Sequence, residues 1–330
     1  MILSILVNFN SQPMLDPAVE SLLSQRLAAD HRILVWENGS DREVGGLVTG
    51  QDSQRAPGVF MHYSGSGINL GYAPAIQRAW QHSMEQDWAA DVTHVHLANP
   101  DTAAHGAEVL AELTKAASYH RALVGPAQVD ATGQFRLSAY PFMRPYNVPL
   151  KHISKGWMRR YARLQADAGR SRDVATLDGS YLVARRADWD LLGGLDEGYL
   201  LYTDDHDLSL RAASRGVGRR LVTSATVTHV GGTSRGRRAR LCELEQIRCS
   251  LRLVALHYGP AAVRRARWLT ASVLLARREP DLAWAARALP TSLPGETELS
   301  IEQRYVAFLN DVGNQRARRL ADRIASEAGL

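Results

Sequence analysis

Short apolar runs alternate with longer helical patterns through the first 130 residues, and this alternation is the feature that most limits the fold. The patterns predict helices between successive strands, with strands over residues 2–8, 32–37, 59–64 and 92–97 and from 122 onward. Strands that alternate with helices in this way are typical of a doubly wound, mostly parallel sheet. We therefore predict an α/β fold with a Rossmann-like central sheet and flanking helices.

Polar residues follow three of the predicted strands directly. They are Asn8 and Asn10, Glu37 and Asn38, and Asn99 and Asp101. In doubly wound sheets ligands bind outside the carboxyl ends of the strands, where these side chains would meet. Their shared placement predicts a ligand site at that edge of the sheet, and it is stronger evidence than any one cluster.

A second polar group lies between residues 193 and 207, where Asp204, Asp205 and Asp207 fall within four positions. Neighbouring carboxylates repel one another, so a fold gains no stability from crowding them. The cluster therefore indicates a bound cation, a shared proton or a hydroxyl that is activated for reaction. A helix N-terminus whose dipole favours acidic side chains explains the same residues equally well when they are taken alone.

The length of 330 residues suits one large α/β domain with an appendage, or two domains. We expect residues 1–235 to form the domain that carries the site. Within it, residues 140–176 contain three prolines and little periodicity, which predicts a mobile loop over the site. Residues 236–330 carry helical patterns, the last over 301–325, and predict a helical C-terminal region.

Charge is unevenly distributed along the chain. The net charge is +5, yet residues 235–330 hold 17 arginines against 10 acidic residues, so this part carries +7 and the rest −2. A basic region of this kind predicts an anionic partner, such as nucleotide phosphates or anionic lipid. Nucleic acid is not expected, because the arginines of 235–240 have no interleaved aromatic residues.

Cysteine content and hydropathy argue against several classes of protein. Only Cys242 and Cys249 occur, which argues against a disulfide-stapled secreted fold and against a cysteine zinc site. The apolar start of the chain, residues 2–7, is typical of a buried strand and not of a signal peptide. No apolar run approaches the roughly 20 residues that span a bilayer. We expect a cytoplasmic protein.

Short motifs occur along the chain in a characteristic order. They lie at residues 7–11, 37–41, 69–73, 97–101, 178–186, 193–197, 204–208 and 228–234. Each motif alone is weak. Together, over roughly residues 2–258, they resemble the family 2 glycosyltransferases, in particular the bacterial rhamnosyltransferase-like branch. The resemblance implies a GT-A fold and the transfer of a sugar from a nucleoside diphosphate.

The resemblance also implies a metal site and a catalytic base. Asp101 and His229 would hold Mg²⁺ or Mn²⁺ with the diphosphate, and Asn99 takes the place of the first aspartate of the usual motif. Asp205 would be the general base, with Asp204 beside it, and direct displacement with one base gives inversion of configuration. Taken alone, Asp101 would more simply cap the following helix, and a lone histidine such as His229 is more often packed or on the surface.

Further residues are implied as substrate contacts. They are Asn8, Asn10, Glu37, Asn38, Asn69, Gly71, Asn99, Asp178, Gly179, Asp196 and Arg248. A Glu37 carboxylate that accepts a hydrogen bond from a pyrimidine N–H would favour uracil or thymine over cytosine. Arg248 would clamp the diphosphate, because a planar guanidinium suits phosphate oxygens, although an exposed arginine is the commoner case. Asp196 would contact the acceptor or merely fix the turn after Gly193 and Gly194.

These expectations combine into an inverting, metal-dependent glycosyltransferase that uses a dTDP- or UDP-sugar, with dTDP-L-rhamnose as the best single choice from the branch. The acceptor would be a growing surface glycan or a polyprenyl-linked saccharide. The basic C-terminal helices would contact the inner membrane face, and a solvated surface or contacts within a homodimer are equal alternatives. A non-catalytic nucleotide-sugar or glycan-binding module on a degenerate scaffold is the second hypothesis, which the substitutions at Glu37, Asn99 and Asp204 permit.

Overall fold

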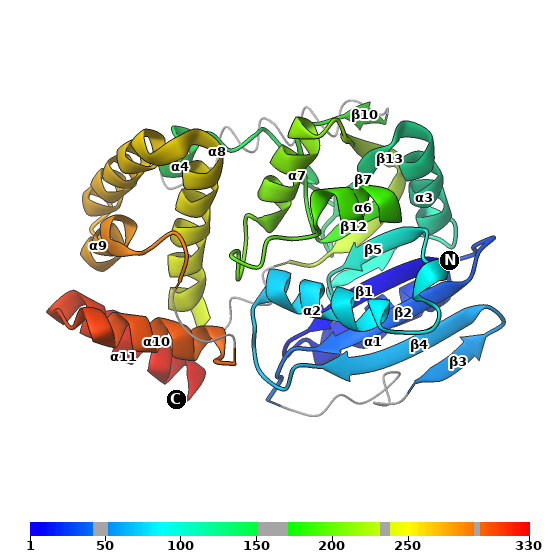
Figure 1. Ribbon diagram of the computed structural model, residues 1–330, viewed down its shortest axis with the longest axis horizontal. Helices are drawn as coiled ribbons and strands as arrows, with labels where there is room; N and C mark the ends of the chain where they lie inside the picture. Colours follow the sequence, from blue (N-terminus) through cyan, green and yellow to red (C-terminus); the bar gives the residue numbers. More distant parts are fainter. Residues whose placement is uncertain (42–51, 151–170, 232–237, 294–297) are drawn as a thin grey trace.

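The computed structural model of the chain describes residues 1–41, 52–150, 171–231, 238–293 and 298–330. Its centre is a mixed sheet whose main strands are β1 (Ile2–Asn8), β2 (His31–Glu37), β3 (Ser53–Ala56), β4 (Val59–Gly65), β5 (His94–Ala98), β7 (Ala122–Val129), β10 (Arg172–Asp173), β12 (Tyr181–Arg185) and β13 (Gly218–His229). Their spatial order is β10-β13-β7-β12-β5-β1-β2-β4-β3 (Figure 1). Two short strands, β6 (Thr102–Ala104) and β8 (Phe135–Arg136), pair with β13 and β7.

Strands β5, β1, β2 and β4 are parallel, as predicted, whereas the edge strand β3 pairs antiparallel with β4. β1 pairs in parallel with β2 and β5, and β2 pairs in parallel with β4. β12 runs antiparallel between β5 and β7, so the whole sheet is mixed. Because Asn8 lies opposite Glu37 at the ends of β1 and β2, the polar residues that follow these strands meet at one edge.

Helices cover both faces of the sheet (Figure 1). Side chains alternate between the faces along β1, so Leu3 and Ile5 pack in one core and Ile2 and Leu6 in another. The first core includes residues of α2 (Tyr72–Met84), α6 (Arg186–Leu192) and α7 (Asp204–Ser214). The second core includes residues of α1 (Gln12–Leu23) and α3 (Val109–His120). These two cores fix the strand ends that surround the site.

The C-terminal region is helical, as predicted, and lies beside the sheet (Figure 1). It consists of α8 (Ala239–Ala276), α9 (Pro280–Ala288), α10 (Ile301–Val312) and α11 (Gln315–Ala328). α8 changes direction at Gly259, which has a positive φ of 81° and is followed by Pro260. The single helix predicted over 301–325 is wrong, because Gly313 ends α10 and the side chain of Asn314 caps α11.

α8 belongs to both parts of the molecule. Its residues Cys249 and Leu253 pack in the core under α2 and α7, whereas Leu244 and Ile247 pack in a separate core with α9, α10 and α11. The part of α8 before Gly259 therefore contributes to the core of the sheet region and to the core of the helical region. The domain boundary at residue 235 stays a prediction.

The segment predicted as a mobile loop, 140–176, is described only at its two ends. These ends hold α4 (Asn147–Leu150) and the paired strands β9 (Ala139–Tyr140) and β11 (Thr176–Leu177). The middle of the segment lies outside the described residues. None of the helices in the described ranges is long and apolar enough to cross a membrane.

Candidate active site

A cavity of about 590 Å³ lies where β1, β2, β5 and β13 end, and the first turns of α7 and α8 close it. It brings together most of the residues that the sequence predicts for the site. Those that line it are Asn38, Asn69, Gly71, Asn99, Asp101, Asp178, Gly179, Asp204, Asp205 and His229. A volume of this size is typical of pockets that hold small molecules and cofactors.

The two metal-ligand candidates face each other across one wall of the cavity. Nε2 of His229 lies 3.6 Å from Oδ1 of Asp101. Asp101 is held in place by two backbone groups, because the N–H of Val230 donates to its carbonyl and the N–H of Gly231 donates to Oδ2 at 2.9 Å. The pairing of β13 with β6 therefore sets the position of both side chains.

Gln128 determines which nitrogen of His229 faces Asp101. The amide Nε2 of Gln128 donates to Oδ1 of Asp178 and to Oγ of Ser180, so its oxygen is the atom left to face the histidine. That oxygen lies 2.9 Å from Nδ1 of His229 and accepts a hydrogen bond from the Nδ1–H group. The lone pair of the ring is then on Nε2, which points toward Asp101.

An imidazole nitrogen beside a carboxylate fits a divalent cation such as Mn²⁺ or Mg²⁺. Among the described residues, no group of three or more His, Cys, Asp or Glu side chains could hold a metal. Asp101 and His229 alone would leave most coordination positions to phosphate oxygens and water, as is usual for these ions. The donor set therefore fits a cation that binds together with a diphosphate.

Three carboxylates, those of Asp178, Asp204 and Asp205, also line the cavity. Asp204 and Asp205 begin α7, and the N–H of Gly179 donates to Oδ2 of Asp205 at 3.3 Å. Burial raises the pKa of Asp204 to about 7, and the charges of Asp207 and Asp178 add to the increase. Burial, together with Asp204 and Asp178, also raises the pKa of Asp205 well above its ordinary value.

Asp178 behaves differently from its two neighbours. Burial alone would raise its pKa, but His229 and hydrogen bonds from Ser180 and Gln128 hold the pKa of Asp178 below its ordinary value. Asp178 therefore carries the negative charge in this cluster, and it is this charge that orients the amide of Gln128. Carboxylates whose pKa values are driven apart in one cavity are typical of catalytic sites.

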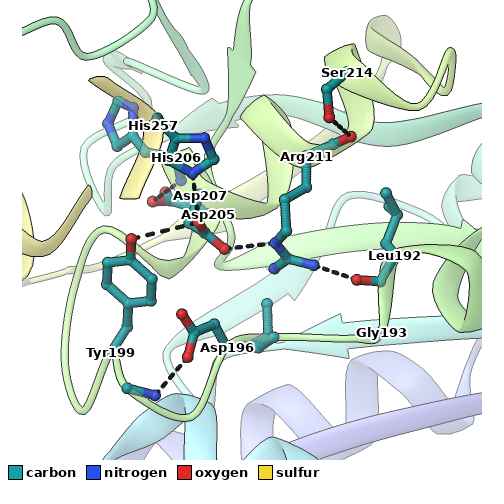
Figure 2. A network of polar contacts seen from close by, with 12 residues as sticks. Leu192, Gly193, Asp196, Tyr199, Asp205, His206, Asp207, Arg211, Ser214 and His257 are labelled. Atoms are coloured by element: carbon teal, nitrogen blue, oxygen red, sulfur yellow. Dashed lines mark hydrogen bonds and ion pairs between the residues drawn. The ribbon is translucent and has the colours of Figure 1, made fainter. Parts of the chain in front are cut away.

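Asp207 is not among the residues that line the cavity and anchors α7 instead, through the contacts drawn in Figure 2. Its carboxylate accepts from Nε of Arg211 at 2.7 Å, lies 2.8 Å from Nε2 of His257 and also accepts from Tyr199. The helical spacing of Asp207 and Arg211 predicts this pair. The anchor fixes the first turn of α7 and with it the position of Asp205.

The backbone that leads into α7 has an unusual conformation. Tyr202 and Thr203 both have left-handed φ angles, 69° and 71°, although neither is glycine. Such conformations cost about 1–3 kcal/mol each and persist where the surroundings enforce them. They turn the chain so that Asp204 and Asp205 enter the cavity at the start of the helix.

Asn38, Asn69 and Gly71 form a linked wall at the end of β2. Nδ2 of Asn38 donates to Oδ1 of Asn69 at 3.1 Å and to the carbonyl of Gly71 at 3.2 Å. Gly71 has a φ of 90°, and a Cβ there would collide with the carbonyl of Leu200. Glycine is therefore required at this close approach.

Three of the predicted nucleotide contacts lie next to this wall and outside the residues that line the cavity. Asn8 is fully buried and donates to Oε2 of Glu37 at 2.6 Å, while the N–H of Ser40 donates to Oε1 of Glu37. Nδ2 of Asn10 donates to Asp41 at 3.0 Å. The contact of Glu37 with a pyrimidine ring stays a prediction.

Two of the predicted substrate contacts are engaged elsewhere. Arg248 is 1% exposed, pairs with Glu245 and does not line the cavity, so the expectation that it clamps the diphosphate is wrong for this arrangement. Its helix places the guanidinium in the interior, between α8 and the 198–201 loop. Asp196 pairs with Arg252 at 2.8 Å and accepts from the N–H of Gly198, which agrees with a role in fixing the turn.

Two arginines that the sequence reasoning missed do line the cavity. Arg136, on β8, donates to the carbonyl of Val230 at 2.7 Å, next to His229 and Asp101. Arg238 lies 4.3 Å from the ring centroid of Phe9 and 2.8 Å from Glu302. Gly231 has a φ of 67°, and a Cβ there would meet the guanidinium of Arg136. Arg238 belongs to the arginine-rich segment 235–240, whereas no local motif marks Arg136.

The fold and the site together define a GT-A glycosyltransferase. Three solved structures share the fold. The first is a mannosyltransferase from Pyrobaculum calidifontis in complex with GDP-Man and Mn²⁺, with a TM-score of 0.53 and 14% identity over 99% of this chain and 85% of that chain. S. aureus TarS 1-349 in complex with UDP-GlcNAc has a TM-score of 0.53 and 12% identity over 100% and 92% of the two chains, and GalNAc-T7 with UDP, GalNAc and Mn²⁺ has a TM-score of 0.57 and 14% identity over 99% and 57%. At these identities the likeness concerns the fold alone.

The sequence relationship is more specific. The chain is 30% identical over 241 residues to the N-acetylglucosaminyl-diphospho-decaprenol L-rhamnosyltransferase of Mycobacterium tuberculosis. The aligned region covers 67% of this chain and 74% of the relative. No family model matches the chain. The chain belongs to the family 2 GT-A glycosyltransferases of the rhamnosyltransferase-like type, and it is a glycosyltransferase. This relationship favours the hypothesis of an enzyme over that of a non-catalytic binding module.

Proposed function

We propose that this enzyme transfers L-rhamnose from dTDP-L-rhamnose to a hydroxyl of a polyprenyl-linked saccharide, with inversion at the anomeric carbon. The observation that carries the proposal is the shared cavity, which Asp205 lines together with the pair formed by Asp101 and His229. The name of the M. tuberculosis relative supports both the rhamnosyl group and the lipid-linked acceptor. A uridine diphosphate sugar and a growing surface glycan remain the alternatives for donor and acceptor.

Asp101 and His229 would hold Mn²⁺ or Mg²⁺ with the diphosphate of the donor. A divalent cation at this position supplies positive charge that stabilises the departing nucleoside diphosphate. Arg136 lies beside the same two residues and contributes a fixed positive charge and hydrogen-bond donors for phosphate oxygens. Asn38, Asn69 and Gly71 would hold the nucleoside at the end of β2.

Asp205 would act as the general base. As the acceptor oxygen forms its bond to the anomeric carbon, the proton of that hydroxyl passes to the Asp205 carboxylate and the bond to the diphosphate breaks. Attack from the side opposite the leaving group gives inversion. The position of Asp205 at the N-terminus of α7 favours its ionised form, whereas burial and the neighbouring carboxylates oppose it.

Incubation of the purified chain with a panel of nucleotide sugars, Mn²⁺ and a soluble N-acetylglucosaminyl-diphospho-lipid analogue tests the proposal. We expect rhamnosylated product from dTDP-L-rhamnose, with the anomeric configuration opposite to that of the donor by NMR spectroscopy. Retention of configuration would contradict the role of Asp205. A stronger preference for a guanosine diphosphate sugar would contradict the proposed donor.

A further inference from the structure

The half of α8 that follows the kink at Gly259 exposes one continuous face. The exposed residues recur at intervals of three and four, which places them on one side of the helix. This α8 outer face consists of Ala261, Arg264, Arg265, Trp268, Leu269, Ser272, Leu275 and Ala276. Their neighbours Ala266, Thr270, Ala271 and Leu274 are buried against the rest of the helical region.

Large apolar side chains stand out on this face. Trp268, Leu269 and Leu275 are 59%, 51% and 56% exposed. They follow one another along the helix, so the water-facing apolar surface is contiguous and not scattered. The guanidinium of Arg287, on α9, lies 3.9 Å from the ring centroid of Trp268 and extends the face toward the next helix.

The same face is cationic. Arg264 and Arg265 precede the apolar residues, and the exposed Arg277 and Arg278 follow them. The sequence contains no acidic residue between Glu245 and Glu279. A helix with an exposed tryptophan and leucines, flanked by arginines and free of acids, has the composition of helices that lie in a membrane interface.

The α8 outer face is connected to the catalytic cavity through the 143–150 segment. Met143 and Asn147 line the cavity, and the hydroxyl of Tyr258, just before the kink, donates to the carbonyl of Met143 at 3.0 Å. α4, within this segment, packs against α8, and the two helices lie side by side in Figure 1. Tyr146 is 60% exposed beside this junction.

We propose that the α8 outer face docks on an anionic lipid bilayer, with Trp268, Leu269 and Leu275 inserted among the headgroups and with Arg264 and Arg265 on lipid phosphates. The choice of a bilayer rests in part on the proposed function, because a polyprenyl-linked acceptor resides in a membrane. Docking through this face would bring the 143–150 segment, and the cavity behind it, close to the lipid surface.

Two other occupants fit the face less well. A second copy of the chain that bound through the same face would place its arginines against those of its partner without any acid between them. A nucleic acid would satisfy the arginines but would leave the leucines without an apolar partner. A bilayer satisfies both kinds of side chain at once.

Co-sedimentation of the full chain with phosphatidylglycerol–phosphatidylcholine vesicles tests the proposal. We expect Arg264→Ser/Arg265→Ser to lower the partition coefficient roughly 25-fold, because each basic residue near anionic lipid contributes about fivefold. Trp268→Ser/Leu269→Ser should lower it at all salt concentrations. Matched controls are Arg316→Ser/Arg318→Ser, which removes the same charge from α11, and Tyr119→Ser, which removes an exposed aromatic from α3; both should bind as the parent does.

The outcomes separate this surface from the proposed activity. The proposed docking surface would be refuted if the parent did not bind vesicles, or if the control variants lost as much vesicle binding as the α8 variants. It would also be refuted if the parent formed a dimer that the α8 substitutions dissociate, or if the parent bound labelled RNA in a mobility-shift assay and the same substitutions removed that binding. Rhamnosyl transfer to a short-chain, water-soluble acceptor should be unchanged in all four variants. Selective loss of vesicle binding without any transfer by the parent would support the surface and refute the activity.

Discussion

Nδ1 of His229 donates a hydrogen bond to Oε1 of Gln128 over 2.9 Å, while the amide nitrogen of Gln128 is bound to Asp178 and Ser180. Through these contacts Gln128, which is not a proposed ligand of the metal or of the substrate, fixes the tautomer of His229, a proposed metal ligand. Outer-shell partners of this kind typically contribute 10–100-fold to metal affinity.

Gln128→Leu should therefore weaken Mn²⁺ binding about 10–100-fold. The measurement is the dissociation constant for Mn²⁺ in the presence of nucleoside diphosphate, by electron paramagnetic resonance or calorimetry. Ser180→Ala is the matched control, because it removes a partner of the amide nitrogen and leaves the bond to His229 in place. Unchanged Mn²⁺ affinity in Gln128→Leu would refute the positioning role.

Asp205→Asn should lower kcat about 10²–10⁴-fold, the usual contribution of a general base, and leave the Kd for nucleoside diphosphate within a few-fold. Because burial and its neighbours raise the pKa of Asp205, the base becomes ionised only at a higher pH than an ordinary aspartate. The rate should therefore fall as the pH is lowered, with the acid limb at a higher pH than that of an ordinary aspartate. Substantial transfer by the asparagine variant would exclude Asp205 as the base.

The raised pKa of Asp204 makes the folded protein sensitive to pH. A carboxyl whose pKa is about 7 when folded, against about 4 when unfolded, binds more protons in the folded state between these values. Stability should therefore decrease as pH rises through this window. In the absence of metal, Asp204→Asn should raise the free energy of unfolding at pH 8 by on the order of a few kcal/mol and change it little at pH 4.

Urea unfolding of Asp204→Asn and of the parent at both pH values gives this comparison. Asp173→Asn serves as the control, because the carboxylate of Asp173 is exposed and pairs with Arg220. A variant that is less stable than the parent at pH 8 would contradict the raised pKa of Asp204.

Much of the fold and part of the site follow from local sequence. Whereas Asp101 and His229 are predicted from the family resemblance, the polar ends of β1 and β2 can be predicted from local sequence, because Asn8 and Glu37 each end a short, largely buried strand. The same holds for Asp207 with Arg211, where helical spacing alone brings the partners together. In these cases the interacting groups are neighbours in the chain or follow from one regular period.

Other parts of the site depend on contacts between distant segments. Gln128 reaches its position only because β7 pairs with β13, and its partner His229 is 101 residues away in the sequence. Arg136 enters the cavity because β8 folds back on β7, which no local pattern indicates. The burial of Arg248 depends on Tyr305, whose hydroxyl donates to the Glu245 partner from α10. Sequence alone does not show which face of a helix packs.

The Glu245–Arg248 pair yields a final prediction. Both side chains are almost fully buried, and the pair holds the 198–201 loop, because Arg248 donates to the carbonyl of Gly198 and Glu245 accepts from the N–H of Leu201. Removal of one partner leaves the other charge buried without compensation, which typically costs about 3–5 kcal/mol. Arg248→Met and Glu245→Gln should each lower the free energy of unfolding by this amount.

The double variant Glu245→Gln/Arg248→Met should lose less than the sum of the two, because no uncompensated charge remains. Arg265→Met, on the exposed side of the same helix, should change stability by less than about 0.5 kcal/mol. Since the 198–201 loop leads to Tyr202 and Thr203 and then to Asp204 and Asp205, kcat should fall in each single variant even where the protein remains folded. Strict additivity of the two losses in urea unfolding would show that the pair does not act as a unit.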